Sequence, residues 1–101
     1  MTHEDERRIL TSIPHKEGEI KIIIAKKDCE LGNHYHKIKT ELFQLIEGSG
    51  EGMINDHSFN LLTGNHYPVG RGDIHSFNLK KDSVLLCVCS HPYNKEDDYE
   101  N

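Results

Sequence analysis

The 101 residues contain no tryptophan and three prolines, and apolar residues make up only 35% of the chain. Apolar runs are short, and none approaches the roughly 20 residues that a helix needs to cross a bilayer. The polar stretch 1–8 also lacks the apolar centre of a signal peptide. We therefore expect a cytoplasmic protein with no membrane partner.

Basic residues are also few. Lys and Arg number 12 against 17 Asp and Glu, which gives a net charge of -5. A protein that binds the phosphates of nucleic acid needs a basic surface. The acidic balance therefore predicts no nucleic-acid partner.

Cysteine occurs three times, an odd number that does not suggest a disulfide framework. Cys87 and Cys89 lie within an apolar run, where a reduced cysteine behaves as a small hydrophobic residue. We expect both to pack as thiols in the wall of the domain.

Short apolar segments rich in β-branched and aromatic residues alternate with Gly, Asn and Asp turns, a pattern typical of an all-β domain. Asn55-Asp56 predicts a tight hairpin.

The expected domain covers residues 16–93, between a polar N-terminal arm, 1–15, and an acidic C-terminal tail, 94–101, both loosely held. Periodicity is compatible with a two-sheet sandwich or a closed barrel. The expected strands are 19–26, 34–37, 41–47, 50–55, 58–62, 67–69, 74–79 and 83–90.

The small size of the chain has a consequence for assembly. A chain of this length builds one modest core, which buries a limited share of its surface. The apolar strand over residues 20–25 carries more aliphatic side chains than one buried face requires. We therefore expect a homodimer.

Four residues have the types and spacing of a metal site. His34 and His36 alternate along an expected strand, so both side chains leave the same face. Glu41 begins the next strand, and His75 comes from a strand much later in the chain. Three imidazoles and a carboxylate suit one divalent transition metal, namely Fe, Mn, Ni, Co, Cu or Zn. An octahedral ion held by four side chains keeps two positions open for substrate.

The same residues carry a family resemblance. Residues 34–48 read H-x-H-x4-E-x6-G, which resembles the first motif of the cupin superfamily, and the run from Gly64 through Gly70, Gly72 and His75 resembles the second. Asp28 stands where the first motif usually opens with glycine, and Gly70 replaces the usual proline. The resemblance implies a small single-domain cupin with a double-stranded β-helix, or jelly-roll, barrel. It also implies His34, His36, Glu41 and His75 as metal ligands.

Alternation from the ligands predicts the substrate pocket. If Glu41 points inward, so do Phe43 and Leu45, and if His75 points inward, so does Phe77. His91 could reach the mouth of the barrel. A pocket with a metal floor and apolar walls favours a small organic substrate.

Three functions remain open from the sequence. The residues around the ligands are similar to those of phosphomannose isomerase-like cupins, which implies an isomerase or epimerase acting on a small sugar or sugar phosphate. The same ligand set is compatible with an Fe(II)-dependent dioxygenase of a small chelating substrate, or with a non-enzymatic small-molecule binding module. The sequence assigns no general base.

Overall fold

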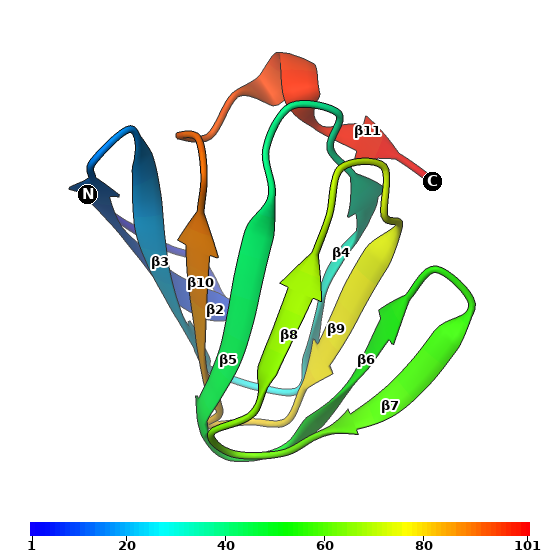
Figure 1. Ribbon diagram of the computed structural model, residues 1–101. Helices are drawn as coiled ribbons and strands as arrows, with labels where there is room; N and C mark the ends of the chain where they lie inside the picture. Colours follow the sequence, from blue (N-terminus) through cyan, green and yellow to red (C-terminus); the bar gives the residue numbers. More distant parts are fainter.

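The computed structural model describes residues 1–101 as two antiparallel sheets packed face to face (Figure 1). In spatial order, the first sheet contains β1 (Thr2–Glu4), β2 (Arg8–His15), β3 (Gly18–Ala25), β10 (Val84–Cys89), β5 (Glu41–Glu47) and β8 (His66–Val69). The second contains β11 (Tyr99–Glu100), β4 (Cys29–Tyr35), β9 (His75–Leu79), β6 (Gly50–Ile54) and β7 (His57–Leu61). The sheets form a jelly roll, which confirms the predicted all-β fold class.

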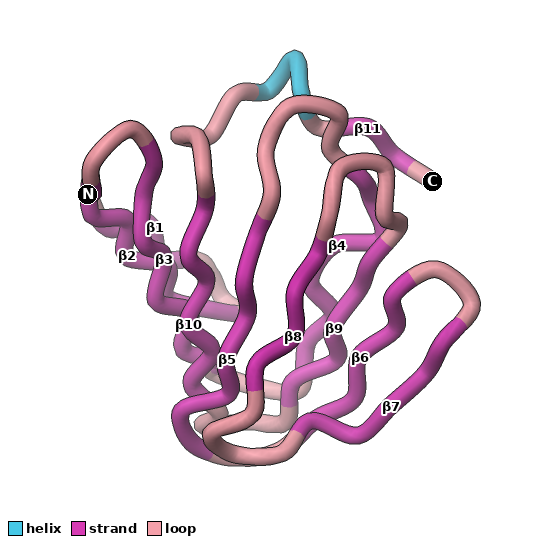
Figure 2. Tube along the Cα trace, in the orientation of Figure 1, coloured by secondary structure: helices cyan, strands magenta, loops and turns pink.

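A 3-10 helix of three residues, η1 (Lys95–Asp97), is the one helix in the tube of Figure 2. The structure contains no helix with the length and apolar character needed to span a membrane.

The core lies between the sheets and is polar at one end. Along β5 the inward side chains are Glu41, Phe43 and Leu45, all buried, while the residues between them point outward. Along β9 the inward His75 is followed by the buried Phe77. Because side chains alternate along a strand, one row places polar groups near the loops and apolar groups in the interior. The candidate site therefore lies at this polar end.

Local backbone conformation directs the first histidine into this end. Gly32 has a φ of 90°, and the pairing of β4 with β9 shifts register between Gly32 and His34. A side chain at residue 32 would place its Cβ 2.9 Å from the carbonyl oxygen of His75. Glycine is needed here because only it tolerates both the positive φ and the close approach.

The Asn55-Asp56 turn is the predicted hairpin. Ile54 pairs with His57 across a two-residue loop, and Asn55 has a φ of 53°. Asparagine adopts this left-handed conformation more readily than most residues, which explains why Asn55 can occupy the turn.

Both chain ends differ from the expectation that they are loosely held. Residues 8–15 form β2, which pairs along its whole length with β3 and so belongs to the first sheet. At the other end, η1 and β11 lie over the loop that joins β4 to β5, and Tyr99 pairs with Tyr35 (Figure 1). The pairing of Tyr99 with Tyr35 joins residues far apart in sequence, so local composition carried no sign of the docked tail.

Candidate metal centre

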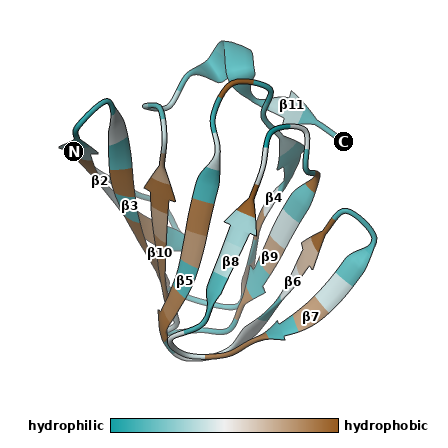
Figure 3. Ribbon diagram, viewed as in Figure 1, coloured by the Kyte–Doolittle hydropathy of each residue, from teal (hydrophilic) through white to brown (hydrophobic).

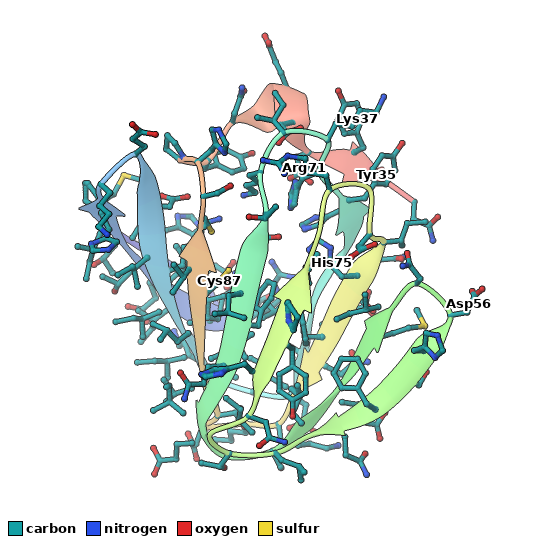
Figure 4. All side chains as sticks on the ribbon, viewed as in Figure 1. Tyr35, Lys37, Asp56, Arg71, His75 and Cys87 are labelled. Atoms are coloured by element: carbon teal, nitrogen blue, oxygen red, sulfur yellow. The ribbon has the colours of Figure 1, made fainter.

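Four predicted ligands converge at the polar end of the core. One ligand atom from each of His34, His36, Glu41 and His75 lies within 4.8 Å of the others. The rings of His34 and His36 have centroids 4.7 Å apart, and the same distance separates His34 from His75. His75 enters the space between the sheets from β9 (Figure 4). The spacing in sequence thus corresponds to one cluster in space.

The outer ring nitrogens of two histidines are held by backbone oxygens. Nδ1 of His36 lies 2.8 Å from the carbonyl oxygen of Asp97, and Nδ1 of His75 lies 3.0 Å from that of Asp73. A carbonyl oxygen only accepts, so both Nδ1 atoms carry the proton of the neutral ring. Each Nε2 therefore presents a lone pair to the centre of the cluster, the tautomer that metal-binding histidines adopt.

These inward atoms lack a partner within the protein. Oε1 of Glu41 lies 3.0 Å from Nε2 of His36 and 3.2 Å from Nε2 of His75. With the protons on Nδ1, three acceptors face one another, and all three atoms are buried without a hydrogen-bond partner. Buried acceptors at this separation are unfavourable unless a cation lies among them. The residues therefore fit a divalent metal ion.

The charge states of the cluster also suit a metal. Burial and the neighbouring His75 lower the pKa of His34 to about 4, so its ring is neutral at pH 7. Burial raises the pKa of Glu41, but hydrogen bonds that His36 and His75 donate when their rings are protonated, together with the charge of Lys39, outweigh it and lower the pKa overall. The carboxylate is thus ionised when the ring of His34 is neutral, as metal binding requires.

The C-terminal tail completes the surroundings of the cluster. Oδ1 of Asp98 lies 3.0 Å from Nδ1 of His34. The carboxylate of Asp97, which is buried, accepts hydrogen bonds at 2.9 to 3.2 Å from the backbone N–H groups of residues 37, 38 and 39. Burial raises the pKa of Asp97, but these N–H groups lower it by more, so Asp97 stays ionised. Sequence reasoning missed both residues because an acidic tail is usually exposed.

The second oxygen of Glu41 has its own neighbours. Cys87 donates a thiol hydrogen bond to Oε2 at 3.4 Å, and Cys89 donates one at 3.7 Å. Nζ of Lys39 lies 3.9 Å from the same oxygen. The contacts on Oε2 orient the carboxylate so that Oε1 faces the histidines. Figure 4 shows Cys87 on β10.

A cavity of about 520 Å³ opens onto the cluster and includes all four ligands in its lining. Phe43 and Phe77 of the predicted pocket also line it. Leu45 lies deeper, fully buried in the core, and His91 is exposed and hydrogen-bonded to Ser90. Alternation along β5 correctly predicted that the side chain of Leu45 points inward, but it did not predict that Leu45 lies in the core and does not line the cavity.

The cavity also contains basic residues that the sequence did not reveal, namely Arg8, Lys21 and Lys39. Alternation along β3 was the available signal for Lys21, because it shares the inward face with the buried Ile23. Arg8 belonged to the expected N-terminal arm, and Lys39 lies in a loop without periodicity.

Solved structures share this fold. The capsular polysaccharide assembling protein CapF from Staphylococcus aureus matches with a TM-score of 0.85 and 20% identity, over 99% of this chain and 31% of CapF. Oxalate decarboxylase from Bacillus subtilis matches with a TM-score of 0.81 and 18% identity, over 99% and 30%. An RmlC-like cupin protein from Desulfovibrio desulfuricans matches with a TM-score of 0.73 and 24% identity, over 89% and 88%.

The fold is therefore that of the cupin superfamily, as the two sequence motifs predicted. The chain spans about a third of the length of CapF and of oxalate decarboxylase. No protein-family model and no curated protein matches the sequence.

Proposed function

We propose that this protein is a metal-dependent isomerase or epimerase whose substrate, a small sugar or sugar phosphate, binds through oxygens that chelate the ion. The observation that carries the proposal is the convergence of the inward nitrogens of His36 and His75 with Oε1 of Glu41 at the wall of a 520 Å³ cavity. His34 completes the donor set.

The donor set favours a borderline transition ion such as Fe, Mn, Co, Ni, Cu or Zn over Mg or Ca, which prefer oxygen ligands. A bound ion supplies Lewis acidity, which polarises a carbonyl and acidifies the neighbouring C–H. The protein holds the donor atoms through Asp73, Asp97 and Asp98 and surrounds the inner part of the cavity with Phe43 and Phe77.

The remaining lining favours proton transfer on a polar substrate. Lys21, Lys39 and Tyr93 line the same cavity as the ligands and carry exchangeable protons. These three side chains can donate hydrogen bonds to a hydroxylated substrate, whose buried hydroxyl groups require partners. Such donors beside the ligand cluster favour the isomerase or epimerase over the dioxygenase.

Two facts about CapF support the substrate class. By name it is a capsular polysaccharide assembling protein, a carbohydrate function, and it has been solved with the inhibitor 3-isopropenyl-tropolone. A tropolone carries adjacent hydroxyl and carbonyl oxygens, the arrangement that a chelating hydroxy-carbonyl sugar presents.

Exchange of the substrate's C–H hydrogen with solvent tests for the proposed proton transfer, and the test does not require that the product sugar be known. Protein reconstituted with Mn, Fe, Co, Ni or Zn is incubated in D2O with aldoses, ketoses and their phosphates, and NMR follows deuterium entering the carbon next to the carbonyl. We expect exchange that requires metal and is lost in His36→Ala. His57→Ala serves as the matched control, because His57 is exposed on β7.

Other results would contradict the proposal. Metal-dependent binding without exchange would identify a binding module, and substrate-dependent oxygen uptake would identify a dioxygenase. Full metal occupancy of His36→Ala would refute the ligand assignment itself.

A further inference from the structure

The charge lining the cavity differs from that of the whole protein. The chain has a net charge of -5, yet Arg8, Lys21 and Lys39 all line the cavity. They balance the acidic lining residues Glu19, Glu41 and Asp98. A divalent ion held by the ligands would add two positive charges, so the loaded cavity has a positive excess that attracts anions.

Lys39 is the basic residue with the fewest partners. Its side chain is 4% exposed, and its nearest carboxylate oxygen, Oε2 of Glu41, lies 3.9 Å from Nζ, beyond hydrogen-bond distance. No protein group accepts a hydrogen bond from this ammonium, although it has three N–H donors. Lys39 lines the cavity, so oxygens of a bound ligand can accept the hydrogen bonds that the protein does not.

Lys21 lines the same cavity and approaches the same aromatic ring as Lys39. The Nζ atoms of Lys21 and Lys39 are 5.6 and 5.9 Å from the ring centroid of Tyr93. Glu19 lies 3.5 Å from Nζ of Lys21, but it also accepts hydrogen bonds from Ser12 and from the backbone of Tyr93. Glu19 is therefore shared among several donors, and Lys39 has no comparable partner.

We infer that Lys39, assisted by Lys21, forms an anion-binding subsite beside the metal centre, and that the natural ligand carries a carboxylate or phosphate close to its chelating oxygens. The inference rests on the proposed metal-dependent function and specifies its substrate class. Oε2 of Glu41 is near Lys39 while Oε1 faces His36 and His75. Only a few bonds can therefore separate the anionic group from the chelating oxygens.

Three ligands with the same hydroxy-ketone group test the subsite. Dihydroxyacetone is neutral, hydroxypyruvate carries a carboxylate, and dihydroxyacetone phosphate carries a phosphate. Calorimetry on metal-loaded protein should show at least about ten-fold tighter binding of an anionic member than of dihydroxyacetone. The order of the two anions identifies which oxyanion the subsite accepts.

The variants separate the subsite from the metal centre. Measured at saturating metal, Lys39→Gln and Lys39→Met should abolish the preference for the anionic ligands over dihydroxyacetone, and Lys39→Arg should keep part of it. Lys27→Gln, at an exposed site, should behave as wild type. Equal binding of all three ligands, or equal loss of all three in Lys39→Gln, would overturn the subsite alone. Failure of the wild type to bind metal would overturn the proposed function.

A separate observation concerns the outer face of the first sheet. Aliphatic side chains alternate outward along three neighbouring strands, and Figure 3 shows apolar segments on β3, β10 and β5. Cross-strand pairing places them side by side, among them Ile20, Ile22 and Ile24 on β3, Leu86 and Val88 on β10, and Leu42 on β5. Every outward position of β3 from residue 20 to 24, and of β10 from residue 84 to 88, is aliphatic, although charged residues make up 29% of the chain.

The dimensions of this face suit a second copy of the chain. Neighbouring strands lie about 4.8 Å apart and each residue extends a strand by about 3.3 Å, so β2, β3, β10 and β5 present a face on the order of 400 Å² in projection. Projecting side chains raise its accessible area toward the roughly 800 Å² per partner of a stable interface. An uncharged aliphatic face is complementary to itself, as a two-fold interface requires.

We propose that two copies associate through this face. Light scattering at micromolar concentration should show a dimer for the wild type and a monomer for Val88→Glu, whose site is already 37% exposed and tolerates a charge in the folded subunit. Leu62→Glu makes the same change at a 58% exposed residue outside the face and should stay dimeric. A monomeric wild type, or a dimeric Val88→Glu, would overturn the interface.

Discussion

The contact between Asp98 and His34 provides a sensitive test of the metal centre, because Asp98 does not contact the ion position itself. Its carboxylate lies 3.0 Å from Nδ1 of His34, and both side chains are roughly two-thirds or more buried. The pKa of His34 is lowered by burial and by His75, and Asp98 is the main influence that raises it. Removing Asp98 therefore makes Nε2 of His34 a weaker metal ligand and removes the contact that fixes the orientation of its ring.

The expected effect of Asp98→Ala is a loss of metal affinity of about 10- to 100-fold, the range seen when the outer partner of a metal-binding histidine is removed. This corresponds to about 1.4 to 2.7 kcal/mol of binding free energy. Competition of the protein with a chromophoric chelator for Zn or Mn measures it directly.

Glu96→Ala supplies the matched control. Glu96 lies in η1, two residues before Asp98. It is exposed, and Glu96→Ala removes the same charge without removing a contact to a candidate ligand. Its metal affinity should stay within about two-fold of wild type, since exposed charges contribute little. If Asp98→Ala binds metal as tightly as Glu96→Ala, the tail does not position His34 and the reasoning is refuted.

Three further outcomes are expected. Asp97→Asn should lower the free energy of unfolding by about 1 to 3 kcal/mol in urea titrations, because the charged carboxylate accepts hydrogen bonds from three backbone N–H groups. Asp56→Asn, in an exposed turn, should change the free energy of unfolding little. Equal effects of the two substitutions would contradict this prediction. Hydrogen bonds from Ser12 and Tyr93 and the charge of Lys21 lower the pKa of Glu19 despite burial, which raises it. Glu19→Gln should therefore be less stable than wild type at neutral pH, and the difference should shrink as pH falls below 4.5; a constant difference would argue against this pairing. Removing metal with a chelator should lower the melting temperature, because binding stabilises the folded state, and an unchanged melting curve would argue against the centre.

Much of the fold and the ligand set could be predicted from local sequence. Strand alternation located the inward Glu41, Phe43, His75 and Phe77, because the two-residue period of a strand is a local property. The spacing of His34, His36 and Glu41 reflects two strands that follow one another in the chain, β4 and β5, although these strands lie in different sheets. The same two-residue period places the aliphatic side chains of β3 outward.

The tertiary structure decided what surrounds those ligands. The carbonyl oxygen of Asp97 reaches His36 across 61 positions in the chain, and the carboxylate of the same residue binds the backbone of the loop that carries Lys39. Such contacts depend on where separate segments meet in space, and no period or local propensity encodes them. The cluster of His34, His36, Glu41 and His75 was therefore predictable from spacing. Its hydrogen-bond partners and the basic lining of the cavity depend on how the two sheets and the tail pack against one another.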